Sequence, residues 1–168
     1  MIFVTVGTHQ QPFERLLSAL AALDGTDLVV QYGTGRRPSG VAVAEPYMPF
    51  DRMLAHFRAA EKVITHAVVG SILCATREGH TPLVVPRRHD LGEHVDEHQA
   101  ELAQALAGRG SVIVVRDTDR LAEQIAQAPP RGETAAASTQ GGLRDSLRRA
   151  LLGARAPARS AQARVDGG

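Results

Sequence analysis

The sequence predicts an α/β protein built on a doubly wound, parallel β-sheet. Two observations lead to this prediction: short apolar runs alternate with stretches of helical period, and the runs are continuously apolar instead of alternating. A strand that is apolar on both sides is buried on both faces of its sheet. The expected strands are Ile2–Val6, Leu28–Tyr32, Val41–Ala44, Val63–Thr65, Leu83–Val85 and Val112–Val115.

Helical periodicity separates the expected strands. Apolar residues recur at helical spacing after Pro12, which occupies a favourable first-turn position, and after Asp51 and Ser71. Two more helices are expected over Glu97–Leu106 and Thr118–Ile125. Strand–helix alternation is typical of right-handed crossovers between parallel strands, so the series predicts one sheet that is covered on both faces.

One folded domain is expected over residues 1–127, which is long enough for a single hydrophobic core. After Gln127 the composition changes to paired prolines, an alanine run and paired glycines, which is typical of a loosely attached tail over residues 128–168. Within that tail, the spacing of leucines and arginines over 143–152 is compatible with one short amphipathic helix.

Composition argues against several classes of protein. The 19 basic and 18 acidic residues give a formal net charge of +1, whereas nucleic-acid binding needs a basic excess on one face. No apolar run approaches the roughly 20 residues of a membrane span, and Met1–Val6 enters a strand with no basic leader before it. The lone Cys74 can close no disulfide within the chain. A cytoplasmic protein is therefore expected.

The loops that follow the strands are the candidate sites, because ligands of open parallel sheets bind beyond the carboxyl ends of the strands. After the first strand, Gly7 would let an anion approach the backbone, with a plain strand-to-helix turn as an equal alternative. After the fourth strand, Gly70 and Ser71 lie where helix N–H groups point outward, which suits a phosphate or diphosphate. His66 could face the same anion, although a structural histidine is the commoner case.

The loop after the fifth strand, PRRHDLGEHVDEHQ, contains three of the seven histidines. A metal cluster is disfavoured there, because only His94 and His98 have the i, i+4 spacing of a helical pair. The favoured interpretation is recognition of sugar hydroxyls by carboxylates and Gln99, with Arg87 or Arg88 near a phosphate. The alternative is a solvated loop with no ligand.

The loop after the third strand combines aromatic and apolar residues over Tyr47–Phe50, and it could flank a flat base. Core packing of Phe50 is an equal alternative.

Elsewhere, Gly33-Thr34-Gly35 is not followed by the helix that a dinucleotide fingerprint needs, and no G-x-S-x-G or P-loop motif occurs. Cys74 lies inside a helix, away from any activating histidine, so nucleophilic catalysis is disfavoured.

Two long segments resemble a known family. VTVGTHQQPFERLL and VITHAVVGSILCATREGHTPLVVPRRHDLGEHVDEHQAELAQAL are similar to the C-terminal, donor-binding domain of glycosyltransferase family 28, over roughly Met1 to Leu106. Within the family, the chain most resembles the short subunits of split bacterial exopolysaccharide glycosyltransferases. It is also similar to the catalytic subunit of the dolichol-linked N-acetylglucosaminyltransferase.

The resemblance implies half of an enzyme with the GT-B fold, in which two Rossmann-like domains enclose a nucleotide-sugar donor. A membrane-attached partner subunit would supply the N-terminal half at the inner face of the cytoplasmic membrane. The implied reaction is inverting transfer of a hexose-type sugar from a UDP-sugar to a polyprenyl-diphosphate-linked glycan, with no metal or other cofactor. The chain alone would be inactive. The alternative is a non-catalytic nucleotide-sugar-binding or regulatory partner of a glycosyltransferase.

The resemblance also assigns roles to residues. By position, the donor-binding residues would be Gly7, Thr8, Met48, Phe50, His66, Gly70, Ser71, Glu97, His98 and Gln99. The main catalytic base is expected on the partner, and His9 is the one local candidate. Two positions depart from the family pattern: Val68 replaces a common glycine, and Cys74 replaces the acid that binds the ribose hydroxyls.

Overall fold

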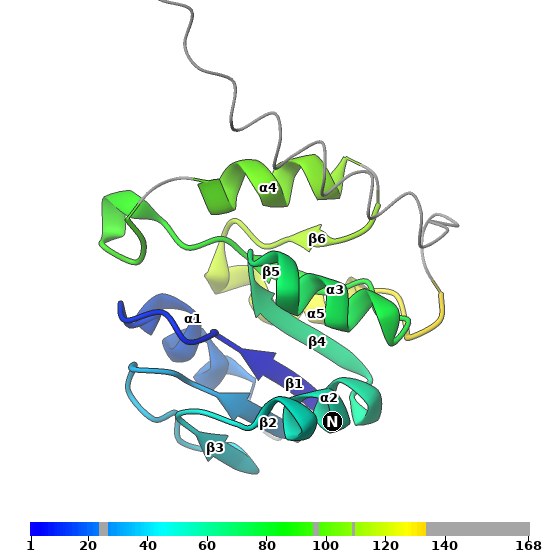
Figure 1. Ribbon diagram of the computed structural model, residues 1–168, viewed down its shortest axis with the longest axis horizontal. Helices are drawn as coiled ribbons and strands as arrows, with labels where there is room; N and C mark the ends of the chain where they lie inside the picture. The colour runs from blue at the N-terminus through cyan, green and yellow to red at the C-terminus, as the bar shows by residue number, and fades with distance from the viewer. Residues whose placement is uncertain (24–26, 96–97, 109, 134–168) are drawn as a thin grey trace, which may run out of the picture.

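A six-stranded parallel sheet forms the centre of the protein in the computed structural model, which describes residues 1–23, 27–95, 98–108 and 110–133 (Figure 1). Its strands are β1 (Ile2–Thr5), β2 (Leu28–Gln31), β3 (Val43–Glu45), β4 (Lys62–His66), β5 (Leu83–Val85) and β6 (Ile113–Val114). They lie in the order β3-β2-β1-β4-β5-β6, and every neighbouring pair is parallel. The predicted doubly wound sheet is therefore confirmed.

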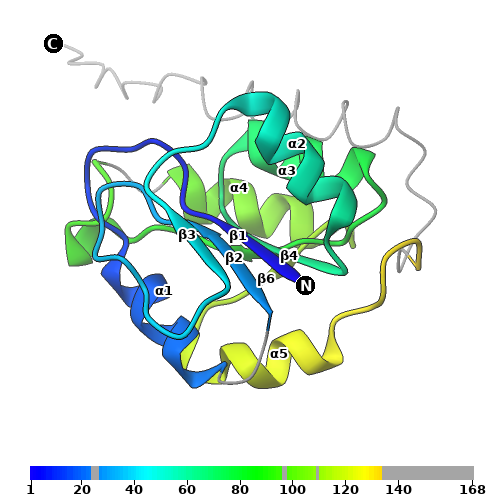
Figure 2. The same ribbon diagram turned by 90° about the horizontal axis from the view of Figure 1, so that it is seen from below.

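Helices cover both faces of the sheet, as Figure 2 shows from the edge. On one face lie α1 (Glu14–Ala19) and α5 (Leu121–Gln127), and on the other lie α2 (Phe50–Ala59), α3 (Val69–Arg77) and α4 (His98–Ala107). Short 3-10 turns add Leu20–Ala22, His89–Leu91 and Thr118–Arg120. None of the helices in the described part of the chain is long and apolar enough to cross a bilayer.

The sheet separates the hydrophobic core into two layers. Toward α1 and α5, buried aliphatic side chains of the strands pack against Phe13, Leu16 and Leu121. Toward α2, the ring of Phe3 meets Phe57 edge to face, with ring centroids 5.0 Å apart. Strands such as β1 and β4 contribute apolar side chains to both layers, so their sequences are apolar at successive positions.

Helix α3 begins two residues before Ser71, the expected start. The N–H of Ile72 donates to the carbonyl of Val68 at 3.1 Å, so the first helical hydrogen bond already closes on Val68. Val68 is the N-cap residue, and its extended backbone (φ −115°, ψ 132°) leads from β4 into the helix. Gly70 and Ser71 therefore both lie in the first turn.

The packed chain continues past Gln127, where the folded part was expected to end. Ala128 is buried, and the Lys62 ammonium donates to the carbonyls of Ile125 and Ala128 at the end of α5. Arg131 Nε donates to the carbonyl of Glu78 at 2.7 Å, which ties the segment to the end of α3. Residues 134–168, including the helix suggested over 143–152, lie outside the described residues.

Candidate functional site

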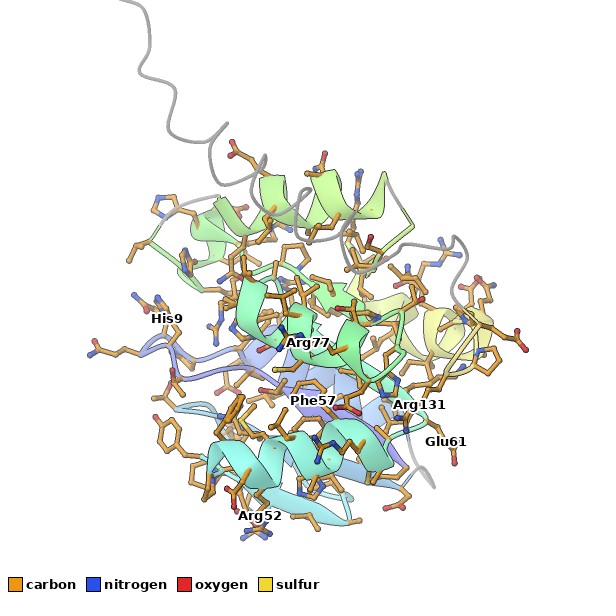
Figure 3. All side chains as sticks on the ribbon, turned by 45° about the vertical axis from the view of Figure 1, so that its right-hand side comes forward. His9, Arg52, Phe57, Glu61, Arg77 and Arg131 are labelled. Atoms are coloured by element: carbon orange, nitrogen blue, oxygen red, sulfur yellow. The ribbon has the colours of Figure 1, made fainter. Side chains whose placement is uncertain are left out.

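The candidate site lies at the carboxyl edge of the sheet, where the strand order reverses. The chain proceeds to β2 and β3 on one side of β1 and to β5 and β6 on the far side of β4, so the loops after β1 and β4 diverge. A hollow of about 460 Å³ opens there, lined by Thr8, His9, Gln10, Gln11, His66, Val68, His94, Val95 and Gln99. In Figure 3, His9 lies at this edge and Arg131 at the opposite one.

Gly7 contacts the ring of His66 directly. Its φ of +76° is a conformation that favours glycine, and a Cβ at this position would overlap the His66 ring. Its N–H and carbonyl are both already bonded to the Gln31 side chain, at 3.1 and 2.9 Å. Gly7 thus shapes the loop by close packing, and its own amide is engaged within the protein.

Gln31, at the end of β2, was not among the expected site residues. Its Oε1 accepts from the Thr5 hydroxyl at 2.7 Å as well as from Gly7, and its Nε2 donates to Pro46 at 2.8 Å as well as to Gly7. This buried amide therefore joins the loops after β1 and β3. The sequence signal was a single polar side chain at the end of the apolar run LVVQ.

His66 is both a structural histidine and a wall of the hollow. Only 4% of the residue is exposed, and one side of its ring lies against Gly7. Burial, followed by the charge of Arg87, lowers the pKa of His66 to about 4. The imidazole is therefore neutral near pH 7, and it adds hydrogen-bonding capacity to the hollow but no positive charge.

The N-terminus of α3 opens beside the hollow without a side-chain cap. The N–H groups of Val69, Gly70 and Ser71 precede the first helical hydrogen bond, so they have no acceptor within the helix. A Cβ at Gly70 would meet no atom within 4 Å, so the space outside this turn is open. An uncapped N-terminus with free space in front of it can bind an anion.

The two arginines after β5 have different environments. Arg87 is fully buried, and its guanidinium donates to the carbonyls of Val6 and Gln11, at 3.0 and 2.8 Å. Arg88 is exposed and forms an ion pair with Asp90. The expectation that one of them reaches a phosphate has no support from these contacts, because Arg87 binds the backbone of the β1 loop instead.

The loop after β3 places Met48 inside and Phe50 outside. Met48 is 9% exposed and packs in the cluster that contains Phe3 and Phe57, whereas Phe50 is 65% exposed. The alternative that Phe50 packs in the core is therefore wrong.

Cys74, in α3, lies against the same cluster. Burial raises the pKa of its thiol, so the residue remains a neutral group there.

The remaining expected residues belong to the loop after β5. The Gln99 side chain is buried, and its Oε1 accepts from the N–H of Arg87 at 3.2 Å while the residue also lines the hollow. His98 begins α4, and Glu97 lies outside the described residues. Both His9 and His94 line the hollow, and their rings are in contact, with centroids 4.6 Å apart. Within the described ranges, no group of three or more histidine, cysteine or acidic side chains could hold a metal ion.

Comparison with known proteins assigns the family. The model of the glycosyltransferase family 28 C-terminal domain matches residues 1–148. The chain belongs to this family. It is 31% identical over 135 residues to the UDP-N-acetylglucosamine transferase subunit ALG13 of Yarrowia lipolytica (strain CLIB 122 / E 150), an alignment that covers 71% of this chain and 66% of that protein.

Solved glycosyltransferases share the fold of this family 28 domain. The glycotransferase of kitacinnamycin superposes with a TM-score of 0.56 at 24% identity, covering 89% of this chain and 39% of that chain. SnogD from Streptomyces nogalater gives a TM-score of 0.53 at 21% identity, covering 90% of this chain and 38% of that chain. The family 28 domain thus corresponds to one Rossmann-like half of the GT-B fold.

Replacing Gln31 with leucine tests the amide that joins the loops. Gln31→Leu keeps the approximate volume but removes the hydrogen bonds of the amide, and the carbonyl of Gly7 loses the partner that it has among the described residues. The N–H of Gly7 keeps the Thr5 hydroxyl at 3.3 Å, and the carbonyl of Pro46 keeps the N–H of Gly33 at 2.9 Å. We expect a loss of about 2 kcal/mol in the free energy of unfolding, since a buried group left unpaired costs about 1–3 kcal/mol. Urea unfolding of wild type and Gln31→Leu measures this difference in the free energy of unfolding. The control Gln104→Leu, on the exposed side of α4, should change stability by about 0.5 kcal/mol or less; equal stabilities of the two variants would contradict the role of Gln31.

Acid should destabilise the protein partly through His66. The unfolded chain binds a proton on this histidine near pH 6.5, whereas folded His66 binds it only near pH 4, so its contribution to stability is lost as the pH falls through that window. The loss should total about 3 kcal/mol at about 1.4 kcal/mol per pKa unit.

Urea unfolding of wild type and His66→Gln between pH 7 and 4 measures this contribution. Burial also lowers the pKa of His56 and His80, so only the difference between the two curves reports on His66. His89→Gln, which removes an exposed histidine, is the control. If the His66→Gln curve runs parallel to wild type, the buried neutral imidazole is refuted.

Proposed function

We propose that this family 28 domain is the donor-binding subunit of a two-component inverting glycosyltransferase. It would transfer a hexose-type sugar from a UDP-sugar to a lipid-linked acceptor in polysaccharide biosynthesis. The observation that carries the proposal is the uncapped N-terminus of α3 beside the hollow at the reversal of strand order. The relative from Yarrowia lipolytica supports it, because its name describes a subunit of a transferase for UDP-N-acetylglucosamine.

The donor diphosphate would be the leaving group of this reaction. Negative charge builds on the diphosphate as the anomeric bond breaks, and the free N–H groups of the first turn of α3, together with the Ser71 hydroxyl, would stabilise it. Neutral His66 would form the wall beside the diphosphate. His9, from the β1 loop, is the local candidate for the base that deprotonates the acceptor, while we expect the main base on the partner.

A partner subunit would cover the carboxyl edge of the sheet. The exposed large apolar side chains of the described residues all belong to segments that follow β3, β4 and β5: Tyr47, Phe50, Val68, Leu91 and Val95. Apolar groups gathered around a hollow are typical of an interaction surface. We propose that a membrane-attached subunit with the N-terminal GT-B half binds here, brings the polyprenyl-diphosphate-linked glycan, and is required for activity.

A second candidate function is a non-catalytic nucleotide-sugar-binding or regulatory partner. Two residues favour it. The exposed side chain of Val68 stands at the N-terminus of α3, where a glycine would leave more room for a phosphate. Cys74 holds a neutral, half-buried thiol at the position that the family resemblance gives to the ribose-binding acid. A thiol cannot accept two hydroxyl protons as a carboxylate does.

Titration calorimetry with UDP tests the donor site, with ADP and NAD as competing nucleotides. We expect selective binding of UDP, weakened by at least about tenfold in Ser71→Ala, since a hydrogen bond to a charged group contributes about 1.5–3 kcal/mol. Val68→Gly should bind UDP more tightly because it clears the first turn of α3. The control Ser18→Ala removes an exposed hydroxyl from α1 and should leave the affinity unchanged.

The same titration on the complex with the partner separates the two functions. UDP binding together with sugar transfer by the complex supports the glycosyltransferase, whereas UDP binding without transfer supports the non-catalytic partner. If neither the chain nor the complex binds UDP, both proposals fail.

A further inference from the structure

Arg87 is the largest fully buried side chain among the described residues, although it carries a charge. Its guanidinium donates to the carbonyls of Val6 at 3.0 Å, Gln11 at 2.8 Å and Glu93 at 3.1 Å, and it lies 4.5 Å from the centroid of the Phe13 ring. Within the described part of the chain, every acceptor that it bonds is a backbone carbonyl, and Nε has no partner. The charge is thus held by peptide dipoles and an aromatic ring.

These carbonyls belong to two loops that both line the hollow. Val6 and Gln11 lie on the loop after β1, and Glu93 lies on the loop after β5, next to the hollow-lining His94. No backbone hydrogen bond between these two loops is present in the described residues. Besides the contact between the rings of His9 and His94, the guanidinium connects the two loops, because its planar fork of N–H groups can bond several carbonyls at once.

An ion pair between Arg15 and Glu93 also holds the loop after β5. Arg15 of α1 forms two hydrogen bonds with the carboxylate of Glu93, at 3.0 and 2.8 Å, and donates to the carbonyl of Pro86. One oxygen of Glu93 also accepts from the N–H of Arg88 at 2.9 Å. The loop after β5 is thus fixed at both ends, and the Arg87 side chain occupies the space between it and the β1 loop.

The charge of Arg87 acts on the hollow itself. His66 lines the hollow, and the Arg87 charge is the second cause, after burial, of its lowered pKa. A positive charge that disfavours an imidazolium in this wall favours an anion in the same space, and low solvent access reduces its screening. An apolar side chain of similar length could fill the volume, but it would provide neither the bonds nor this field.

We propose that Arg87 is a positioning residue of the donor site: it joins the loops after β1 and β5 into one wall and places a buried positive charge behind the hollow. The proposal rests on the proposed function only for the identity of the ligand, a nucleoside diphosphate. Arg87 itself does not contact the ligand in this arrangement, since its donors are directed to backbone carbonyls.

Two substitutions separate the bonds from the charge. Arg87→Met removes the hydrogen bonds and the positive charge but keeps a long side chain. Arg87→Lys keeps the positive charge but lacks the planar guanidinium that bonds several carbonyls. The control Arg88→Met removes the neighbouring exposed arginine, which pairs with Asp90. Three quantities are measured: amide hydrogen exchange of residues 8–11, the pKa of His66 from its ring resonances in NMR, and the affinity for UDP. His9 and His94 also face His66, so its own resonances must be followed.

We expect faster exchange of residues 8–11 in both Arg87 variants, by about tenfold or more, although the substitution lies in the other loop. The pKa of His66 should rise by about one unit in Arg87→Met and stay low in Arg87→Lys. UDP affinity should fall by about tenfold in Arg87→Met and less in Arg87→Lys. The Arg88→Met protein should match wild type in exchange and in the pKa of His66.

If residues 8–11 exchange in Arg87→Lys at the wild-type rate, the proposed connection between the loops is overturned, and this result holds even if Arg87→Met does not fold. An equal pKa of His66 in wild type and a folded Arg87→Met protein would overturn the role of the charge. If wild type does not bind UDP, the proposed function fails instead, while the exchange and pKa measurements still decide the role of Arg87.

Discussion

The shape of the hollow depends on how the polar backbone of its loops is satisfied where the sheet ends. Gln31 and Arg87 do this from inside the protein: the amide binds the loops after β1 and β3, and the guanidinium binds the loops after β1 and β5. The β1 loop is common to both and is therefore held from two sides. Because buried peptide groups without partners are costly, these two side chains restrict the loops to one arrangement.

One consequence concerns which groups remain available to a ligand. Gly7 has its N–H and carbonyl bonded to Gln31, and Gln99 has its Oε1 bonded to Arg87. The first turn of α3 differs, since neither its N-cap side chain nor the helix provides acceptors for its N–H groups. Because Gly7 and Gln99 are bonded within the protein, the N–H groups at the start of α3 are the groups beside the hollow that we expect to bind an anion.

The sequence predicted the sheet well because buried strands have a local signal. The run Leu83–Val85 matches β5 in both bounds, and the other strands differ by one or two residues at their ends. The site was predicted less completely. Hydrogen bonds of Gln31 and Arg87 reach residues 24 and 76 positions away, and no local pattern contains such contacts. Likewise, periodicity does not decide whether Met48 or Phe50 turns inward, because that depends on the space beside Phe57.

The arrangement of these loops bears on the proposed need for a partner subunit. Gln31 and Arg87 organise the loops from the sheet side, but on the solvent side the hollow is bordered by Val68 and Val95, which are exposed apolar groups. Apolar side chains beside an anion site strengthen its electrostatics only when a covering surface excludes water. A second subunit over this edge would bury these side chains and lower the dielectric around the N-terminus of α3 in a single step. Binding of the partner and stabilisation of the leaving diphosphate would then be coupled through the same few residues.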